Sequence, residues 1–243
     1  MSGPLASNLR KDLENTVTDA RRRAEDGARA ALTSLAVGEA SAQAVMSEGD
    51  KALRRRLRAR GRQLGDRRDA SSKTQAVDRL VHEIAYEHWH RMLFARFLSE
   101  NNLLIHPEAK VAISLDEIEE LAREQGVDCD ELAASYAQQA LPQIFRRDDP
   151  VLEVELAVEH RNAIKKLLEG LPAEVFTADD SLGWTYQYWQ KDKKAAVNES
   201  GVKIGADEIS AVTQLFTEHY MVLFLYHNTV GAWHAGKVLA ANP

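Results

Sequence analysis

The stretch VDRLVHEIAYEHWHRMLFARFL, residues 77–98, indicates the fold class most clearly. Its large apolar side chains recur at spacings of three and four, which is the period of an α-helix with one buried face. We therefore expect a core helix from about Lys73 to Glu100. Turn-forming residues are scarce, with 13 Gly and 6 Pro among 243 residues, which disfavours a β-sandwich or a β-barrel. The sequence predicts an all-α fold.

Three segments are expected along the chain. Its length fits one large domain or two modest ones, and 44% hydrophobic residues can bury a sizeable core. Residues 1–70 carry narrow apolar stripes and are predicted to form a basic helical arm, with two helices broken near Gly38. Residues 71–206 contain the core helix and are predicted to form a helical bundle domain. Residues 207–243 form a third segment, whose last helix is expected to begin with Thr217 as its N-cap residue.

Other helix ends follow from capping patterns. Ser114-x-x-Glu117 is typical of a capping box that opens a short helix, and Gly126 suits its C-terminal end. Two further helices are predicted over 150–170, where Pro150 follows Asp149, and over 178–198.

Several kinds of chemical site lack their sequence signatures. The chain has no Gly-rich phosphate loop, no G-x-S-x-G motif and no supported pair of catalytic carboxylates. The single cysteine, Cys129, stands between two aspartates, which would raise the thiol pKa and disfavour a nucleophile. Glu87-x-x-His90 has the spacing of a di-iron ligand pair, but a second such motif is missing. We expect no metal site and no catalytic residue in this chain.

The sequence also bears on cellular location. No apolar run approaches the ~18 residues of a membrane span, and the start MSGPLASNLRKDLEN lacks the apolar core of a signal peptide. One cysteine cannot form an intrachain disulfide. We expect a protein of the reducing cytoplasm that does not have a membrane as a partner.

Charge is unevenly distributed between the two parts of the chain. Residues 1–70 carry 15 Lys and Arg against 10 Asp and Glu, whereas residues 71–243 carry 16 against 27, which gives net charges of +5 and -11. The basic excess is densest over 51–68, where nine cations meet the single anion Asp66. Such a density suits the phosphate backbone of DNA. The predicted phosphate contacts are Arg54, Arg55, Arg56, Arg58, Arg60 and Arg62.

Two alternatives to phosphate binding stay open for these arginines. They would either form a solvated helix face or make ion pairs with the acidic part of the same chain. A helix also turns by 100° per residue, so about half of the six can contact one duplex at the same time.

Four short stretches near the C-terminal end and one in the core helix carry a family resemblance. They are LGWTYQYW at 182–189, TQLFT at 213–217, YMV at 220–222, NTVGAW at 228–233 and WHRMLFARFL at 89–98. This pattern resembles the region before the catalytic core of large adenine-specific DNA methyltransferases, and most closely the BREX phage-defence methyltransferases of the PglX type. The resemblance covers about residues 75–243.

The resemblance implies an enzyme that methylates adenine at N6 in double-stranded DNA, at specific sites, in phage defence or restriction-modification. The methyl donor would be S-adenosylmethionine. In the family, the segment that matches TQLFT is motif X, which helps to hold the methionine end of this cofactor. Carried over, Thr213, Gln214, Phe216 and Thr217 would border the cofactor site. This sequence has Glu218 where the family commonly has proline.

The resemblance also implies that the catalytic machinery is not in this chain. The family's Gly-rich cofactor loop and its (N/D)-P-P-(Y/F) catalytic motif should follow motif X, and neither occurs here. We therefore expect residues 207–243 to lead into a missing catalytic domain and the chain alone to be inactive. The partners would be double-stranded DNA and other phage-defence subunits. The alternative is a non-catalytic helical adapter or DNA-binding module that docks partner subunits.

Overall fold

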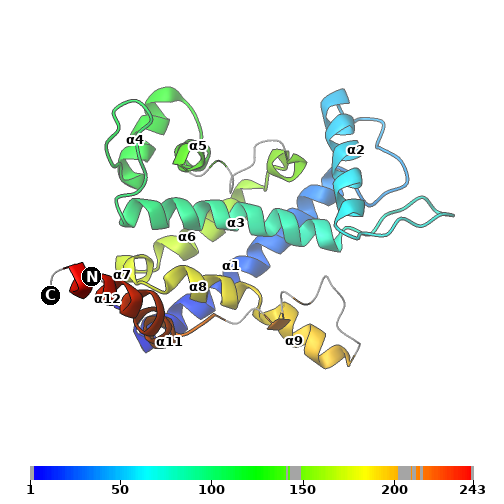
Figure 1. Ribbon diagram of the computed structural model, residues 1–243. Coiled ribbons are helices and arrows are strands. Elements are labelled where there is room, and N and C mark those ends of the chain that lie inside the picture. Colours follow the sequence, from blue (N-terminus) through cyan, green and yellow to red (C-terminus); the bar gives the residue numbers. More distant parts are fainter. Residues whose placement is uncertain are drawn as a thin grey trace. The chain divides into compact units, whose positions relative to one another are not determined.

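The computed structural model describes residues 3–140, 142, 149–201, 209, 212–213 and 216–241. These residues form helices and no β-strand, so the predicted all-α fold is confirmed (Figure 1). The α-helices are α1 (Ser7–Ser34), α2 (Glu48–Gln63), α3 (Asp78–Glu100), α4 (Leu115–Gln125), α5 (Cys129–Ala140), α6 (Val158–Glu169), α7 (Ala173–Thr177), α8 (Ser181–Trp189), α9 (Lys191–Ser200), α11 (His219–Tyr226) and α12 (Ala232–Ala241). A short 3-10 helix, η1 (Pro150–Glu153), and a π-helical turn, η2 (His227–Gly231), complete them.

The chain divides into two compact units. One consists of Thr18–Ala173, and the other of Met1–Val17 together with Glu174–Pro243. The functional division predicted at residues 70 and 206 stays a prediction, because regions that serve different partners need not coincide with compact units.

The core of the larger unit is built on α3. This helix packs against α2, α4, α5, α6 and η1. Leu80, Ile84 and Trp89 on its inner face are almost completely buried. Burying such side chains is worth about 1.5–3 kcal/mol each. The predicted core helix is therefore confirmed, and it organises the packing of its whole unit.

The start of α3 is set by a distant carboxylate. The helix begins at Asp78 rather than near Lys73 as predicted. The buried side chain of Asp66 accepts hydrogen bonds from the backbone N–H groups of Arg79, at 2.9 Å, and Leu80, at 3.0 Å. The first N–H groups of a helix have no partner within the helix, so this carboxylate acts as a cap supplied from outside it.

Helix α4 follows its capping pattern, and α5 packs beside it. Ser114 Oγ accepts a hydrogen bond from the Glu117 N–H at 3.2 Å, and the Glu117 carboxylate accepts one from the Ser114 N–H at 2.7 Å. Gly126 ends α4 in the left-handed region with φ of 67°. The predicted capping box and helix end are confirmed. Both helices pack on the C-terminal half of α3 in one apolar cluster.

The single helix predicted over 150–170 is wrong. Residues Pro150–Glu153 form one 3-10 turn, and α6 begins only at Val158. Val154 and Leu156, in the irregular segment between them, bury their side chains. Burying these alternate side chains requires a non-helical backbone here, so tertiary packing overrides the local start signal of Asp149 and Pro150.

The helix predicted over 178–198 is two helices that meet at Gln190. Helix α8 buries Trp184 and Tyr188, whereas α9 has no buried residue. The break between the helices comes where the side chains change from aromatic to charged, and the charged segment lies mostly in solvent.

His88 on α3 is a partly buried histidine with one defined partner. Its Nε2 lies 2.8 Å from the carbonyl oxygen of Val154. Burial lowers the pKa of His88 to about 4, because the charged ring would lose its hydration. The ring is therefore neutral at physiological pH and donates to this carbonyl.

This histidine predicts a loss of stability in mild acid. The folded-state pKa lies below the ordinary value of 6.5, so the unfolded chain takes up a proton between pH 6.5 and 4 that the folded chain does not. Between pH 7 and 5 we expect His88 to remove about 2 kcal/mol from the free energy of unfolding. Urea unfolding at both pH values should show this loss in the native protein and a smaller one in His88→Gln, which keeps a donor for Val154. Identical pH dependence in the two proteins would contradict it.

Candidate functional site

The six arginines predicted to contact phosphates lie on three faces of α2. Each residue advances by 100° around the helix, so positions four or seven apart share a face. The pairs are Arg54 with Arg58, Arg56 with Arg60, and Arg55 with Arg62.

The first pair is buried and holds neighbouring loops. Arg54 donates to the carbonyl of Glu39 at 2.6 Å, and Arg58 donates to the carbonyls of Val37 at 2.6 Å and Lys73 at 2.8 Å. Both side chains are buried, and burial lowers the pKa of both guanidinium groups. Their donors are used inside the fold, so this face of α2 does not present them to DNA.

The second pair forms ion pairs within the same unit. Arg56 binds the Glu153 carboxylate with two hydrogen bonds, one of 2.7 Å. Arg60 lies 2.8 Å from Glu83 and 3.0 Å from Asp149. For this pair the geometry favours the alternative in which the basic arm pairs with the acidic part of the chain.

The third pair is exposed to solvent. Neither Arg55 nor Arg62 forms an ion pair with another described residue, and Arg62 makes one hydrogen bond of 3.2 Å to Gln75 Oε1. These two side chains are therefore available to an external anion. On α2, phosphate contacts therefore stay a prediction for Arg55 and Arg62 only.

Phe216, one of the residues predicted to border the cofactor, is anchored on α8. The ring of Phe216 packs against Trp184 with centroids 5.1 Å apart, and its backbone N–H donates to Gln187 Oε1 at 2.8 Å. Gly183 leaves room for this ring, because a Cβ there would lie 1.8 Å from it. The packing fixes the position of Phe216 on the aromatic helix.

Glu218, the residue that departs from the family pattern, has a cationic partner. Its Oε1 lies 3.5 Å from Nη1 of Arg10 on α1. The Arg10 guanidinium also stacks 4.0 Å from the ring centroid of Trp184. A cation held against an aromatic face is stabilised further by the ring quadrupole. The charge of Glu218 is thus balanced locally.

Thr217 is not the N-cap of the last helix, contrary to the prediction. Helix α11 begins at His219, Glu218 occupies the cap position, and no side chain caps the helix. The carbonyl of Glu218 accepts the first helical hydrogen bonds, so Thr217 lies one residue too early. Both Thr217 and Thr213 are exposed, and Gln214 lies outside the described residues. Their place beside a cofactor stays a prediction.

Residues 219–241 form an apolar helical segment that is exposed in the described part of the chain. It comprises α11, η2 and α12, none of which has a buried residue. Phe224 is 66% exposed, Trp233 61% and Leu239 69%. Monomeric soluble proteins rarely expose a continuous apolar surface of this kind, which usually marks an interaction site. In the part of the chain that the structure describes, no helix is long and apolar enough to cross a bilayer.

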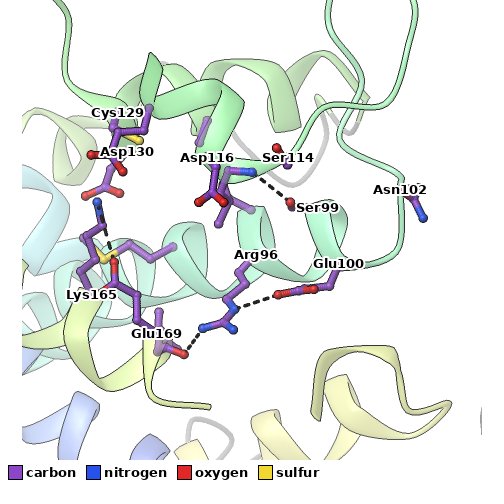
Figure 2. A pocket seen from close by; sticks show the side chains of 16 residues that line it. Arg96, Ser99, Glu100, Asn102, Ser114, Asp116, Cys129, Asp130, Lys165 and Glu169 are labelled. Atoms are coloured by element: carbon purple, nitrogen blue, oxygen red, sulfur yellow. Dashed lines mark hydrogen bonds and ion pairs between the residues drawn. The ribbon is translucent and has the colours of Figure 1, made fainter. Parts of the chain in front are cut away.

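A cavity of about 460 Å³ lies in the larger unit among α3, α4, α5 and α6 (Figure 2). Lys165 and Asp130 approach one another at one end, where burial raises the pKa of Asp130. Arg96 is held by Glu100 at 3.3 Å and by the carbonyl of Leu171 at 2.8 Å. The charged lining residues are Arg96, Glu100, Asp116, Glu119, Asp130, Lys165 and Glu169.

Cys129 lines this cavity, and its thiol is predicted to react slowly. Burial is the main cause that raises its pKa, and the neighbouring carboxylates add to it. Little thiolate is therefore present at neutral pH. At pH 7.5 we expect iodoacetamide to alkylate Cys129 at least several-fold more slowly than a cysteine in an unfolded peptide, with the rate rising above pH 9. Mass spectrometry of timed samples measures the rate, and alkylation as fast as in the peptide would contradict the burial argument.

The histidines and carboxylates of α3 have structural partners. His82 Nδ1 lies 2.9 Å from Glu25 Oε1, and His90 stacks between Tyr86 and Phe94 with centroids 5.3 and 5.6 Å away. Among the described residues no group of three or more His, Cys, Asp or Glu side chains is placed to hold a metal ion.

Comparison with curated proteins adds an independent observation. The chain is 26% identical over 192 residues to an adenine-specific methyltransferase, BrxX, of Escherichia coli O9:H4 (strain HS), a match that covers 66% of this chain and 16% of that protein. It is 26% identical over 200 residues to an adenine-specific methyltransferase, PglX, of Lacticaseibacillus casei (strain Zhang), which covers 66% and 17%. The chain resembles part of an adenine-specific methyltransferase. This confirms the resemblance that the sequence motifs indicate. No family model and no solved structure matches the chain.

The chain spans less than a fifth of the length of these two methyltransferases. It therefore shares one region with them. The activity of a whole methyltransferase does not follow for that region alone.

Proposed function

We propose that this chain is the N-terminal helical region of a site-specific DNA adenine N6 methyltransferase in a BREX-type phage-defence or restriction-modification system of the cytoplasm. The observation that carries the proposal is the similarity to BrxX and PglX over two thirds of the chain. In the complete enzyme, a flipped adenine receives the methyl group of S-adenosylmethionine. The chain alone is inactive, because its sequence contains no catalytic motif.

The apolar helical segment supports a role as one region of a larger enzyme. Side chains such as Phe224 and Leu239 lie mostly in solvent, and each would gain free energy on burial. We propose that the catalytic domain of the complete enzyme covers residues 219–241. Residues 207–243 then connect the helical region to that domain.

The proposed cofactor contacts come from the same connection. Thr213, Gln214, Phe216 and Thr217 would border S-adenosylmethionine on one side of its site, with Phe216 fixed by its packing on α8. The ion pair of Glu218 with Arg10 supports this arrangement, because a balanced Glu218 does not repel the carboxylate of the cofactor.

A second candidate function is a non-catalytic helical adapter. The apolar helical segment favours it equally, since an exposed apolar helix can dock a partner subunit instead of a catalytic domain. The adapter would need neither the cofactor nor a catalytic motif.

The coding sequence after the codon for Pro243 separates the two functions. The methyltransferase proposal expects an open frame with a Gly-rich loop and then an (N/D)-P-P-(Y/F) motif. A stop codon at that point would overturn it in favour of the adapter.

A further inference from the structure

A short hairpin connects α2 and α3 (Figure 1). Its sequence contains cations that the phosphate prediction did not include. Arg68 pairs with Gln75, and the Asp69 N–H donates to the Thr74 carbonyl at 3.0 Å. The Asp69 carboxylate closes the turn by accepting hydrogen bonds from the N–H groups of the two serines that follow it. The turn therefore has a defined conformation although it is exposed.

The hairpin is fastened to α2 by hydrogen bonds. Arg58 donates to the Lys73 carbonyl at 2.8 Å, and Gln75 Nε2 donates to the Arg58 carbonyl at 3.0 Å. Arg68 pairs with Gln75, and the Gln75 side chain bonds α2, so the hairpin lies beside the helix at this pair. The hairpin and the exposed face of α2 thus meet, and we call their exposed cations Arg55, Arg62, Arg67, Arg68 and Lys73 the basic hairpin surface.

The cations of this surface lie near carboxylates without forming ion pairs with them among the described residues. None of its five cations forms an ion pair with a described residue. The neighbouring carboxylates are already engaged: Glu48 by Lys51, Asp50 by Ser47, Asp66 by the start of α3 and Asp69 by the hairpin turn.

Two cations of this surface, Arg62 and Arg68, lie close enough to the buried Arg58 to repel its positive charge. After burial, the positive charges of Arg54, Arg68 and Arg62 are further causes that lower the pKa of Arg58. Structural hydrogen bonds hold these like charges together, and an external anion would relieve their repulsion.

We propose that the basic hairpin surface binds the phosphate backbone of double-stranded DNA without reading its sequence. The inference rests on the proposed function for the choice of DNA among polyanions. Two exposed cations of α2 and three of the hairpin then contact the duplex, while Arg54 and Arg58 act as positioning residues that hold the hairpin against the helix.

The test measures binding of the 243-residue chain to a fluorescent 30-base-pair duplex by anisotropy, over a range of salt concentrations. The variant Arg67→Gln/Arg68→Gln should bind about tenfold more weakly at low salt, and its log–log salt slope should be smaller by about 2, one per lost phosphate contact. The matched control is Arg22→Gln/Arg23→Gln, which removes two exposed cations from α1 and should change affinity less than twofold.

A charge-conserving variant controls for misfolding of the Gln variant. Arg67→Lys/Arg68→Lys should restore most of the affinity, because phosphate contacts need charge rather than the shape of the guanidinium group. An equal loss in the hairpin and control variants, or an unchanged salt slope in the Gln variant, would overturn the proposal. Tighter binding to heparin than to DNA at equal charge would also count against it.

Failure of this inference can be told apart from failure of the proposed function. If only the inference fails, the complete enzyme methylates DNA and Arg67→Gln/Arg68→Gln leaves its KM for DNA unchanged. If only the proposed function fails, the chain binds DNA through the hairpin and the complete protein forms no N6-methyladenine.

Discussion

Replacing Arg58 with methionine should lower the free energy of unfolding by about 3 kcal/mol, because buried carbonyl groups would lose their donor. The guanidinium donates to the carbonyls of Val37 and Glu39 in one loop and of Lys73 in the hairpin. Methionine keeps the apolar stem of the side chain and removes all of these donors. The carbonyls would then be partly desolvated and unpaired.

Urea unfolding followed by circular dichroism measures this effect. The matched control is Arg55→Met, an exposed arginine three residues earlier on α2, which should change the free energy of unfolding by less than about 0.5 kcal/mol. Equal effects of the two substitutions would show that the position of Arg58 inside the fold is unimportant, against the structure.

The second large effect is expected for Phe224→Asp in the complete enzyme that we propose. Phe224 is 66% exposed in this chain and belongs to the apolar helical segment that we propose the catalytic domain covers. A covered phenylalanine contributes about 1.5–3 kcal/mol, so its loss should reduce the methylation rate roughly 10- to 100-fold. The burial of an unpaired carboxylate would add to the loss.

The control for this substitution is Val45→Asp, which introduces the same charge at a loop residue that is 91% exposed. Incorporation of labelled methyl groups into DNA measures the rate for both variants. Full activity of Phe224→Asp would mean that the catalytic domain does not cover this helix.

The core and the local helix ends could be predicted because their signals are close in the sequence. The period of three and four in α3 places Ile84 and Leu93 in the core, and Ser114 with Glu117 forms the expected capping box. In each of these cases the residues that interact lie within a few turns of one another.

The roles of the arginines could not be predicted because they depend on distant backbone. Arg54 and Arg58 lie in the same Arg-rich stretch as Arg55. Only the folded loop after α1 places backbone carbonyls against Arg54 and Arg58 and leaves Arg55 exposed. A 100° period predicts that the arginines spread over several faces, but it does not say which face is buried.

Two contacts between distant residues could not be predicted for the same reason. Asp66 caps a helix that begins 12 residues later in the sequence, and Arg10 pairs with Glu218 from the opposite end of the chain. No local spacing links either pair. The isolated anion in a basic stretch was the one available signal for Asp66, since a lone carboxylate among nine cations is unusual.

Formation of N6-methyladenine tests the central claim most directly. The complete protein and the 243-residue chain are each incubated with S-adenosylmethionine and host DNA, and the nucleosides are quantified by mass spectrometry. We expect N6-methyladenine with the complete protein and none with the chain alone. Absence of N6-methyladenine with the complete protein, or its formation by the chain alone, would contradict the claim that these residues are the helical region of an adenine methyltransferase.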